Sequence, residues 1–368
     1  MVGQTELTNS RELGIDFLRI LSMFMVVILH VLGRGGILDH TRWMSGQYVT
    51  SWFWEVIAFC AVNCFALISG YVGVISKFRW SRILSLWFQV VFYTLGITMI
   101  FEFYMPETTG LIAWMQAIFP ITTRPYWYIT SYVGMFIFIP FMNIILERTS
   151  RKAMELFLIL VLIFFCLLPC ILQQSPYGFA GGYSMAWLLI LYLAGGYIQK
   201  YNIPKLITRK RALIIFLVST ILTLLSKFAI VNVIYKISGR IVEGGNFISY
   251  LSPFIIVNAV ALLCLFANTK FKSHSMQKII SILSPATLGV YIIHENPLIR
   301  NHLIVDAFSS LAQSNPFVLT AGVFISAIGI YAICSLIEIM RIKLFEILRV
   351  KVICQKFDSL MERFATSK

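Results

Sequence analysis

The chain has 368 residues, of which 59% are hydrophobic and only 12% are charged. A soluble core cannot bury that much apolar surface, so the composition excludes an ordinary globular or disordered protein and indicates a polytopic membrane protein. The formal net charge is +14, but the basic residues gather between apolar segments as membrane topology requires, and we expect no nucleic-acid partner.

A search window matched to a hydrocarbon layer of roughly 30 Å predicts ten membrane spans. They lie near residues 14–33, 52–75, 83–103, 127–146, 154–172, 184–199, 212–232, 248–267, 286–300 and 317–340. The sixth and ninth are short, and Pro297 interrupts the ninth, so both are candidates for tilted, interfacial or partly re-entrant segments. We therefore predict an all-α bundle of about ten transmembrane helices embedded in the lipid bilayer.

Basic residues predict the orientation of the bundle. With the N-terminus inside, most of the 30 Lys and Arg residues fall on the cytoplasmic side, and every loop satisfies the positive-inside rule. Both termini are therefore predicted to be cytoplasmic. Residues 1–345 are predicted to form one transmembrane domain, and residues 346–368 a basic, amphipathic cytoplasmic tail.

The first span contains two ionisable residues, Arg19 and His30. Such side chains cost at least a few kcal/mol in a membrane helix unless a partner or water compensates them, so the pair indicates a site. Helix geometry places His30 within roughly 20° of Arg19 and about 16 Å further along. Asp16, one turn before Arg19, is predicted to hold the guanidinium by a charge-assisted hydrogen bond. The alternative is that Arg19 and His30 snorkel to opposite headgroup regions.

A basic cluster of Lys77, Arg79 and Arg82 follows the second span. Spaced cations beside a span are usually topology determinants, and the residues alone favour that interpretation. The cluster also suits phosphate oxygens, because arginine gives planar bidentate contacts and lysine a point charge.

An aromatic run at residues 126–132 follows the predicted outward loop before the fourth span. Aromatic residues at a membrane boundary normally form the interfacial belt, and we favour that interpretation here. The alternative is that these rings line the entrance for a sugar-containing acceptor.

A second intramembrane histidine, His294, precedes Glu295 in the short segment that Pro297 interrupts. Half-helices and irregular backbone are tolerated at membrane depth where they line a cavity. If His294 faces inward, it can meet the polar stripe of the first span. The alternative is a histidine that only bridges two helices.

The seven cysteines predict neither a disulfide nor a metal site. Cys60 with Cys64, and Cys166 with Cys170, share a helix face, but no histidine clusters with them. We interpret them as small apolar packing residues and expect no metal.

Several motifs together resemble the acyltransferase-3 family of integral membrane O-acyltransferases. They are Arg19 and His30 with ten residues between them, residues 65–71 with 77–79 behind them, residues 126–132 through 140–143, and residues 289–294. No single motif is strongly specific, but the set occurs in the expected order over nearly the whole chain. The chain most resembles bacterial members that acetylate cell-surface polysaccharides, and it is similar to the membrane portion of vancomycin-type serine racemases.

This resemblance implies a bacterial plasma-membrane enzyme with a cytoplasmic acyl-CoA donor, acetyl-CoA by default. The acceptor would be a hydroxyl of a cell-surface or lipid-linked glycan. In the family, importance is assigned to the Arg-x10-His pair, here Arg19 and His30, and to the cluster represented here by Lys77 and Arg79. Many relatives carry a fused extracytoplasmic domain of the SGNH type, which we do not expect in this chain.

Acyl transfer from a thioester needs a nucleophilic hydroxyl, a base and donors for the developing oxyanion. We assign the base to His30. Arg19, oriented by Asp16, is expected to bind a donor phosphate or the oxyanion, with the long pantetheine arm spanning the distance to His30. Lys77, Arg79 and Arg82 are expected to hold the nucleotide phosphates. His294, with Tyr291 or Glu295, is expected to act as a second acid or base or to stabilise an acyl-enzyme.

A secondary transporter or polysaccharide flippase is the competing function. Ten spans, a discontinuous ninth helix and ionisable residues at membrane depth are also typical of transporters. Transporters usually show an internal repeat, however, and the pattern of the first span has no counterpart near residues 184–232.

Overall fold

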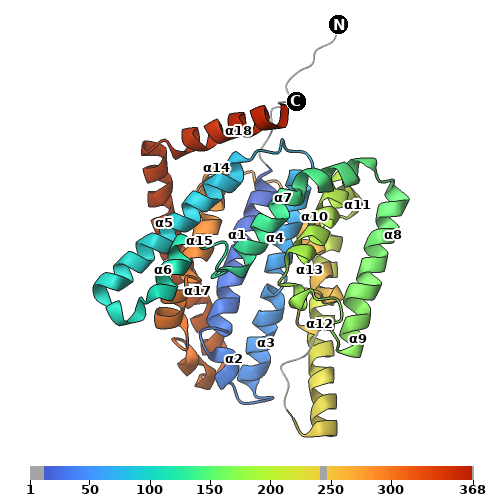
Figure 1. Cartoon of the computed structure of the whole chain (residues 1–368). Coiled ribbons are helices and arrows are strands. Elements are labelled where there is room, and N and C mark those ends of the chain that lie inside the picture. Colours follow the sequence, from blue (N-terminus) through green and yellow to red (C-terminus); the bar gives the residue numbers. More distant parts are fainter. Residues whose placement is uncertain (1–11, 241–246, 367–368) are drawn as a thin grey trace.

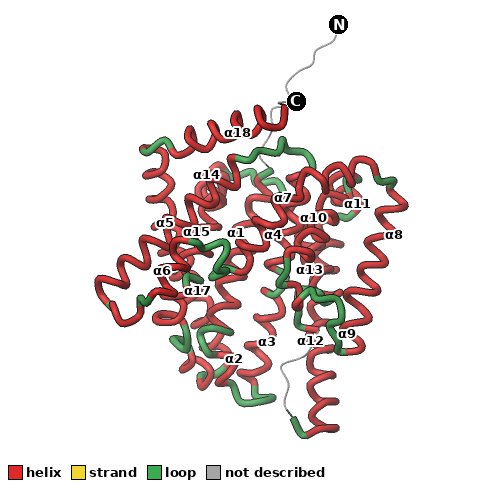
Figure 2. Tube along the Cα trace, viewed as in Figure 1, coloured by secondary structure: helices red, strands yellow, loops and turns green. Residues whose placement is uncertain are grey.

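The computed structural model describes residues 12–240 and 247–366. These residues form helices joined mostly by short loops, and no strand occurs among them (Figure 2). The helices are α1 (Leu13–Leu32), α2 (Ile37–His40), α3 (Gly46–Ala58), α4 (Ala61–Gly73), α5 (Ser81–Tyr104), α6 (Leu111–Ile118), α7 (Trp127–Arg148), α8 (Arg151–Val161), α9 (Leu168–Leu172), α10 (Met185–Lys200), α11 (Ile203–Leu206), α12 (Arg209–Ser238), α13 (Pro253–Ala267), α14 (His274–Leu283), α15 (Thr287–His294), α16 (Pro297–Ile299), α17 (Pro316–Ile347) and α18 (Val350–Thr366).

Eight helical segments of the described chain are long and apolar enough to cross a membrane, which confirms an all-α polytopic bundle. They are Leu13–His40, Gly46–Gly73, Ser81–Tyr104, Trp127–Arg148, Arg151–Leu172, Arg209–Ser238, His274–His294 and Pro316–Ile347. The shorter helices α10 and α13 coincide with the sixth and eighth predicted spans.

The centre of the bundle is formed by α1 and α4, whose residues are mostly buried. Figure 1 shows α1 and α4 in the middle, with α8 toward one edge and α5 toward the other. The long helices α12 and α17 expose many large apolar side chains, among them Ile221 and Ile325. Such surfaces are stable against lipid tails but not against water.

Two glycines bring α4 and α10 into backbone contact. A Cβ atom added at Gly70 of α4 would overlap the carbonyl of Tyr192, and one added at Gly195 of α10 would overlap the carbonyl of Leu67. Small residues permit this close packing, which stabilises helix pairs inside membranes where no hydrophobic driving force acts between them.

The ninth predicted span needs a correction. It was expected at residues 286–300, but the spanning segment is His274–His294, in which a 3-10 turn at residues 284–286 joins α14 to α15. Pro285 fits the first positions of that turn, where its missing N–H is no loss, so the chain continues in the same direction. The predicted interruption at Pro297 is confirmed, because α15 ends at His294 and Pro297 begins α16.

The last helix, α18, lies across the end of the bundle at which α1 begins (Figure 1). The Asp358 carboxylate of α18 accepts a hydrogen bond of 2.7 Å from the backbone N–H of Ser81, at the first residue of α5. Cys354 of α18 is fully buried. The predicted tail is therefore a helix that packs on the transmembrane domain.

Candidate active site

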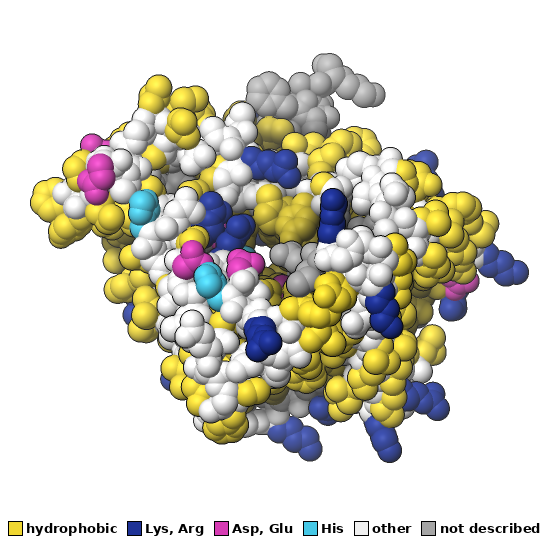
Figure 3. Space-filling model, turned by 90° about the horizontal axis from the view of Figure 1, so that it is seen from below, with side chains coloured by type: hydrophobic (Ala, Val, Ile, Leu, Met, Phe, Trp, Pro, Cys, Tyr) yellow, Lys and Arg dark blue, Asp and Glu magenta, His cyan; other side chains and the backbone are white. Residues whose placement is uncertain are grey.

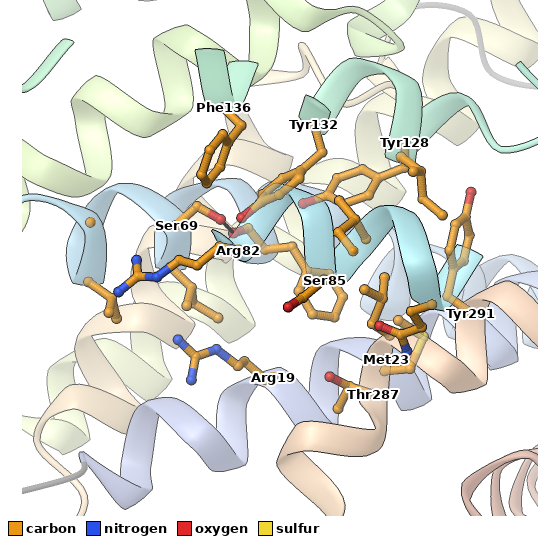
Figure 4. A pocket seen from close by; sticks show the side chains of 18 of the residues that line it. Arg19, Met23, Ser69, Arg82, Ser85, Tyr128, Tyr132, Phe136, Thr287 and Tyr291 are labelled. Carbon is orange, nitrogen blue, oxygen red and sulfur yellow. Dashed lines mark hydrogen bonds between the residues drawn. The ribbon is translucent and has the colours of Figure 1, made fainter. Parts of the chain in front are cut away.

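A cavity of about 790 Å³ opens inside the bundle between α1, α4, α5, α7, α15 and the C-terminal helices α17 and α18. Arg19 and His30 both line it, which agrees with their predicted position on one face of the first span. In Figure 4 the guanidinium groups of Arg19 and Arg82 point into the same part of the cavity, and Tyr291 lies at its other end. The cavity thus runs from a cationic region toward the histidine.

The predicted partnership between Arg19 and Asp16 is confirmed. Nη1 of Arg19 lies 2.5 Å from Oδ1 of Asp16. Asp16 is buried and also accepts a hydrogen bond of 3.0 Å from the Ser284 hydroxyl, just before α15. This carboxylate therefore fixes the direction of Arg19, because the pair joins residues one helical turn apart and the serine holds the carboxylate from a second segment.

His30 and His294 meet at the other end of α1. Nδ1 of His30 lies 2.8 Å from Nε2 of His294, and Nδ1 of His294 lies 2.5 Å from the carbonyl oxygen of Val290. A carbonyl only accepts, so Nδ1 of His294 carries a proton. In neutral rings Nε2 of His294 then accepts from Nδ1–H of His30, which leaves Nε2 of His30 unprotonated.

Glu295 lies beside this pair, at the end of α15. Its Oε2 atom is 3.4 Å from Nδ1 of His30, and its Oε1 atom is 2.9 Å from Nη1 of Arg300 and 3.6 Å from Nη2 of Arg34. The carboxylate is buried. Two guanidinium groups therefore hold a carboxylate next to an imidazole that gains positive charge whenever it takes up a proton.

The three predicted phosphate ligands separate in the structure. Arg79 and Arg82 line the cavity. Lys77 is not among the lining residues; its side chain is 75% exposed, and Nζ lies 3.7 Å from Oε1 of Glu362 on α18. Only the two arginines of the cluster are therefore positioned at the cavity.

The comparisons with known proteins identify the family of the chain. A sequence model of the family described as an acyltransferase domain matches residues 12–336. The chain belongs to the acyltransferase-3 family. No curated protein and no solved structure matches it. The protein is thus a multi-pass membrane acyltransferase, and the match covers α1 through most of α17.

The aromatic run of this acyltransferase does not form the interfacial belt that we favoured. Trp127, Tyr128 and Tyr132 line the cavity, and Tyr126 is fully buried. The Tyr126 hydroxyl donates to the carbonyl of Ile292 at 3.0 Å and accepts from the Asn296 side chain at 2.9 Å. These contacts hold the start of α7 against the end of α15, so the rings point inward.

Sequence reasoning missed a buried carboxylate in the acyltransferase, Glu338 of α17. It accepts hydrogen bonds from Gln89 and Tyr93 of α5, at 3.0 and 2.6 Å, and pairs with Arg341. Arg341 lines the cavity. An acidic residue within an apolar span is itself a signal of a functional site. Glu338 could have been recognised from the sequence by this rule.

The face of the acyltransferase opposite α18 is hollowed. Figure 3 shows basic, acidic and histidine side chains around a hollow that has hydrophobic side chains in its floor. Arg34, whose side chain is 53% exposed, lies at this end, one turn beyond His30. Polar groups therefore occur at both ends of the bundle.

Proposed function

We propose that the protein transfers an acyl group, acetyl by the family-based expectation, from cytoplasmic acyl-CoA to a hydroxyl of a cell-surface or lipid-linked glycan in a bacterial plasma membrane. The observation that carries the proposal is the single cavity that connects the arginines near α18 with His30. The family match favours this function over the transporter alternative.

The residues present fit an acyl-CoA molecule. Arg19, Arg79 and Arg82 lie where a donor entering from the cytoplasmic end would place its phosphates, and guanidinium groups suit phosphate geometry. The walls between them and His30 are mostly apolar and aromatic, which suits the pantetheine arm. The buried hydroxyl of Tyr291 has no hydrogen-bond partner within the described residues, so a polar atom of the substrate would satisfy it.

His30 supports general base catalysis. The acceptor hydroxyl attacks the thioester carbonyl of acyl-CoA and loses its proton, the new ester C–O bond forms as the C–S bond breaks, and CoA leaves as a thiolate that takes up the proton held by the base. Nε2 of His30 takes this proton while Nδ1–H keeps its hydrogen bond to His294. Glu295, 3.4 Å from Nδ1, stabilises the imidazolium that results. His294, tied to Val290, keeps His30 in the required tautomer and orientation.

Replacement of His30 tests the proposal. We expect His30→Gln to insert at a normal level but to lower acyl transfer by roughly 10²- to 10⁴-fold, the usual contribution of a positioned base. His274→Gln is the matched control, because His274 is exposed at the start of α14, outside the cavity. Mass analysis of surface glycans detects the acyl group, and normal acylation by a stably inserted His30 variant would overturn the assignment.

A further inference from the structure

The segment beyond the family match takes part in the cavity. The match ends at residue 336, but α17 continues to Ile347, and α18 then folds back over the bundle (Figure 1). Arg341 of α17 and Lys351 of α18 line the same cavity as Arg19 and Arg82. The C-terminal segment thus adds two cations, and several further lining residues between 342 and 355, to a cavity whose remaining lining residues lie within the family match.

Arg341 is held rigidly. Its Nε and Nη2 atoms donate to Glu338 at 2.9 and 2.6 Å, and its side chain is only 11% exposed. Glu338 is fully buried and is itself held by Tyr93 and Gln89. These two hydrogen bonds use Nε and Nη2 and not Nη1, and the guanidinium carbon lies 4.5 Å from the centre of the Phe345 ring. A mostly buried, preorganised guanidinium that keeps one nitrogen outside its carboxylate pair is well suited to bind an anion.

Gly289 makes room for this arrangement. A Cβ atom added at Gly289 of α15 would overlap the Glu338 carboxylate. The carboxylate therefore packs directly on the backbone of the helix that carries His294. The position of Arg341 is fixed by α5, α15 and α17 together.

Helix α18, whose Lys351 lines the cavity, is attached to the rest of the bundle by several contacts. Asp358 accepts from the N–H of Ser81, Glu362 pairs with Lys77, and Cys354 is buried beneath the helix. Arg79, Arg82 and Lys351 have no carboxylate within ion-pair distance among the described residues, and Glu346 is the single carboxylate in the cavity lining. This end of the cavity therefore keeps an excess of positive charge that attracts polyanions.

We propose that Arg341 and Lys351 bind phosphate groups of the acyl donor, so that the C-terminal segment forms one wall of a nucleotide site. The inference rests on the proposed use of acyl-CoA and assigns the part of the donor that these helices hold. Arg341 contacts a phosphate through Nη1, and Lys351 closes the site as a point charge from above. Lys77 acts here by fastening α18 rather than by touching the donor.

Calorimetric titration of the purified full-length protein tests this assignment with two probes, CoA and pantetheine, because pantetheine lacks every phosphate. We expect Arg341→Gln and Lys351→Gln each to weaken CoA binding by roughly tenfold to a hundredfold, the usual loss for a charged hydrogen bond, and to leave pantetheine binding unchanged. Arg341→Lys should restore part of the affinity. The matched controls are Lys343→Gln and Lys356→Gln, two exposed lysines on the same helices that do not line the cavity.

Two results would overturn the inference, and a third would overturn the proposed donor. If Arg341→Gln and Lys351→Gln bind CoA as tightly as the control variants do, or lose CoA and pantetheine equally, the C-terminal segment is not a phosphate site. If the unaltered protein binds no CoA, the proposed donor itself is wrong. Should Arg341→Gln unfold because Glu338 loses its partner, the double variant Glu338→Gln/Arg341→Gln removes both charges, and its CoA affinity is measured in the same way.

Discussion

The nitrogen atoms of His30 and His294 form one chain of hydrogen bonds that ends at a backbone carbonyl. Because Val290 accepts from His294, the direction of every proton in the chain is fixed, and only Nε2 of His30 remains free to take a new one. If His294 is replaced by a residue that cannot accept a hydrogen bond from His30, Nδ1 of His30 is no longer held in its protonated form. The replacement would therefore affect catalysis through His30, without His294 itself taking a proton from the substrate.

Glu295 is expected to act on the charged form of His30. We predict that Glu295→Gln lowers the single-turnover rate of acyl transfer by roughly tenfold to a hundredfold, because the imidazolium loses its carboxylate and Arg34 and Arg300 lose their shared partner. CoA affinity should not change, since Glu295 does not line the cavity. Glu107→Gln, an exposed carboxylate outside the cavity, is the control. An unchanged rate for Glu295→Gln would show that the carboxylate only holds the two arginines.

Residues close in sequence were predicted more accurately than residues that meet through the fold. The Arg19–Asp16 pair follows from helical spacing alone, and it is present. Contact of His294 with the stripe of the first span was predicted only on the condition that His294 faces inward, because 264 residues separate the two histidines. Arg341 was missed because its significance depends on how α17 and α18 pack, which periodicity does not show.

At the scale of helices, α10 packs against both α4 and α7. The close approach of α4 and α10 therefore also positions α7, whose aromatic side chains line the cavity. We predict that Gly70→Ala lowers the free energy of unfolding of the detergent-solubilised protein by about 1–3 kcal/mol, because the added Cβ atom overlaps the Tyr192 carbonyl and one of the two backbones must move. A lower melting temperature than that of the unaltered protein would show this loss.

Gly96→Ala is the matched control for that prediction. Gly96 also lies within a spanning helix, α5, but a Cβ atom there meets nothing within 4 Å. Alanine favours helix by roughly 1 kcal/mol over glycine, so this variant should be as stable as the unaltered protein or more so. Equal melting temperatures for Gly70→Ala and Gly96→Ala would contradict the packing role.

Span existence was predictable because a long apolar run has no stable alternative in a membrane. The limits of the ninth span were not, since residues 274–283 are amphipathic and resemble a cytoplasmic surface segment rather than a lipid-facing one. The inward-facing aromatic run was misread for a related reason. Composition indicates that Trp127 and Tyr128 are near a membrane boundary, but whether they face lipid or a cavity is decided by the neighbouring helices.

For the whole molecule, the cavity links the α18 end to His30, and a second polar region with Arg34 and Arg300 begins beyond the histidine. A donor held from one end and an acceptor reaching His30 from the other would meet at the imidazole without either crossing the bundle. A transporter with the same residues would instead need its substrate to pass His30 and leave on the far side.

Replacing His294 separates these two functions. Under the proposed acyl transfer, His294→Ala disorients His30, so acyl groups disappear from surface polysaccharide while the polymer reaches the outside in normal amount. Under polymer export, the same variant traps polymer inside and leaves the acyl content of exported polymer unchanged. Measuring exported polymer and its acyl content in the same cells distinguishes the two, with membrane levels of the variant as the control for insertion.

We expect loss of acyl groups without loss of export, because His294 contacts His30 directly at 2.8 Å and the family of the chain is an acyltransferase family. Failed export with unaltered acylation would refute the enzymatic assignment.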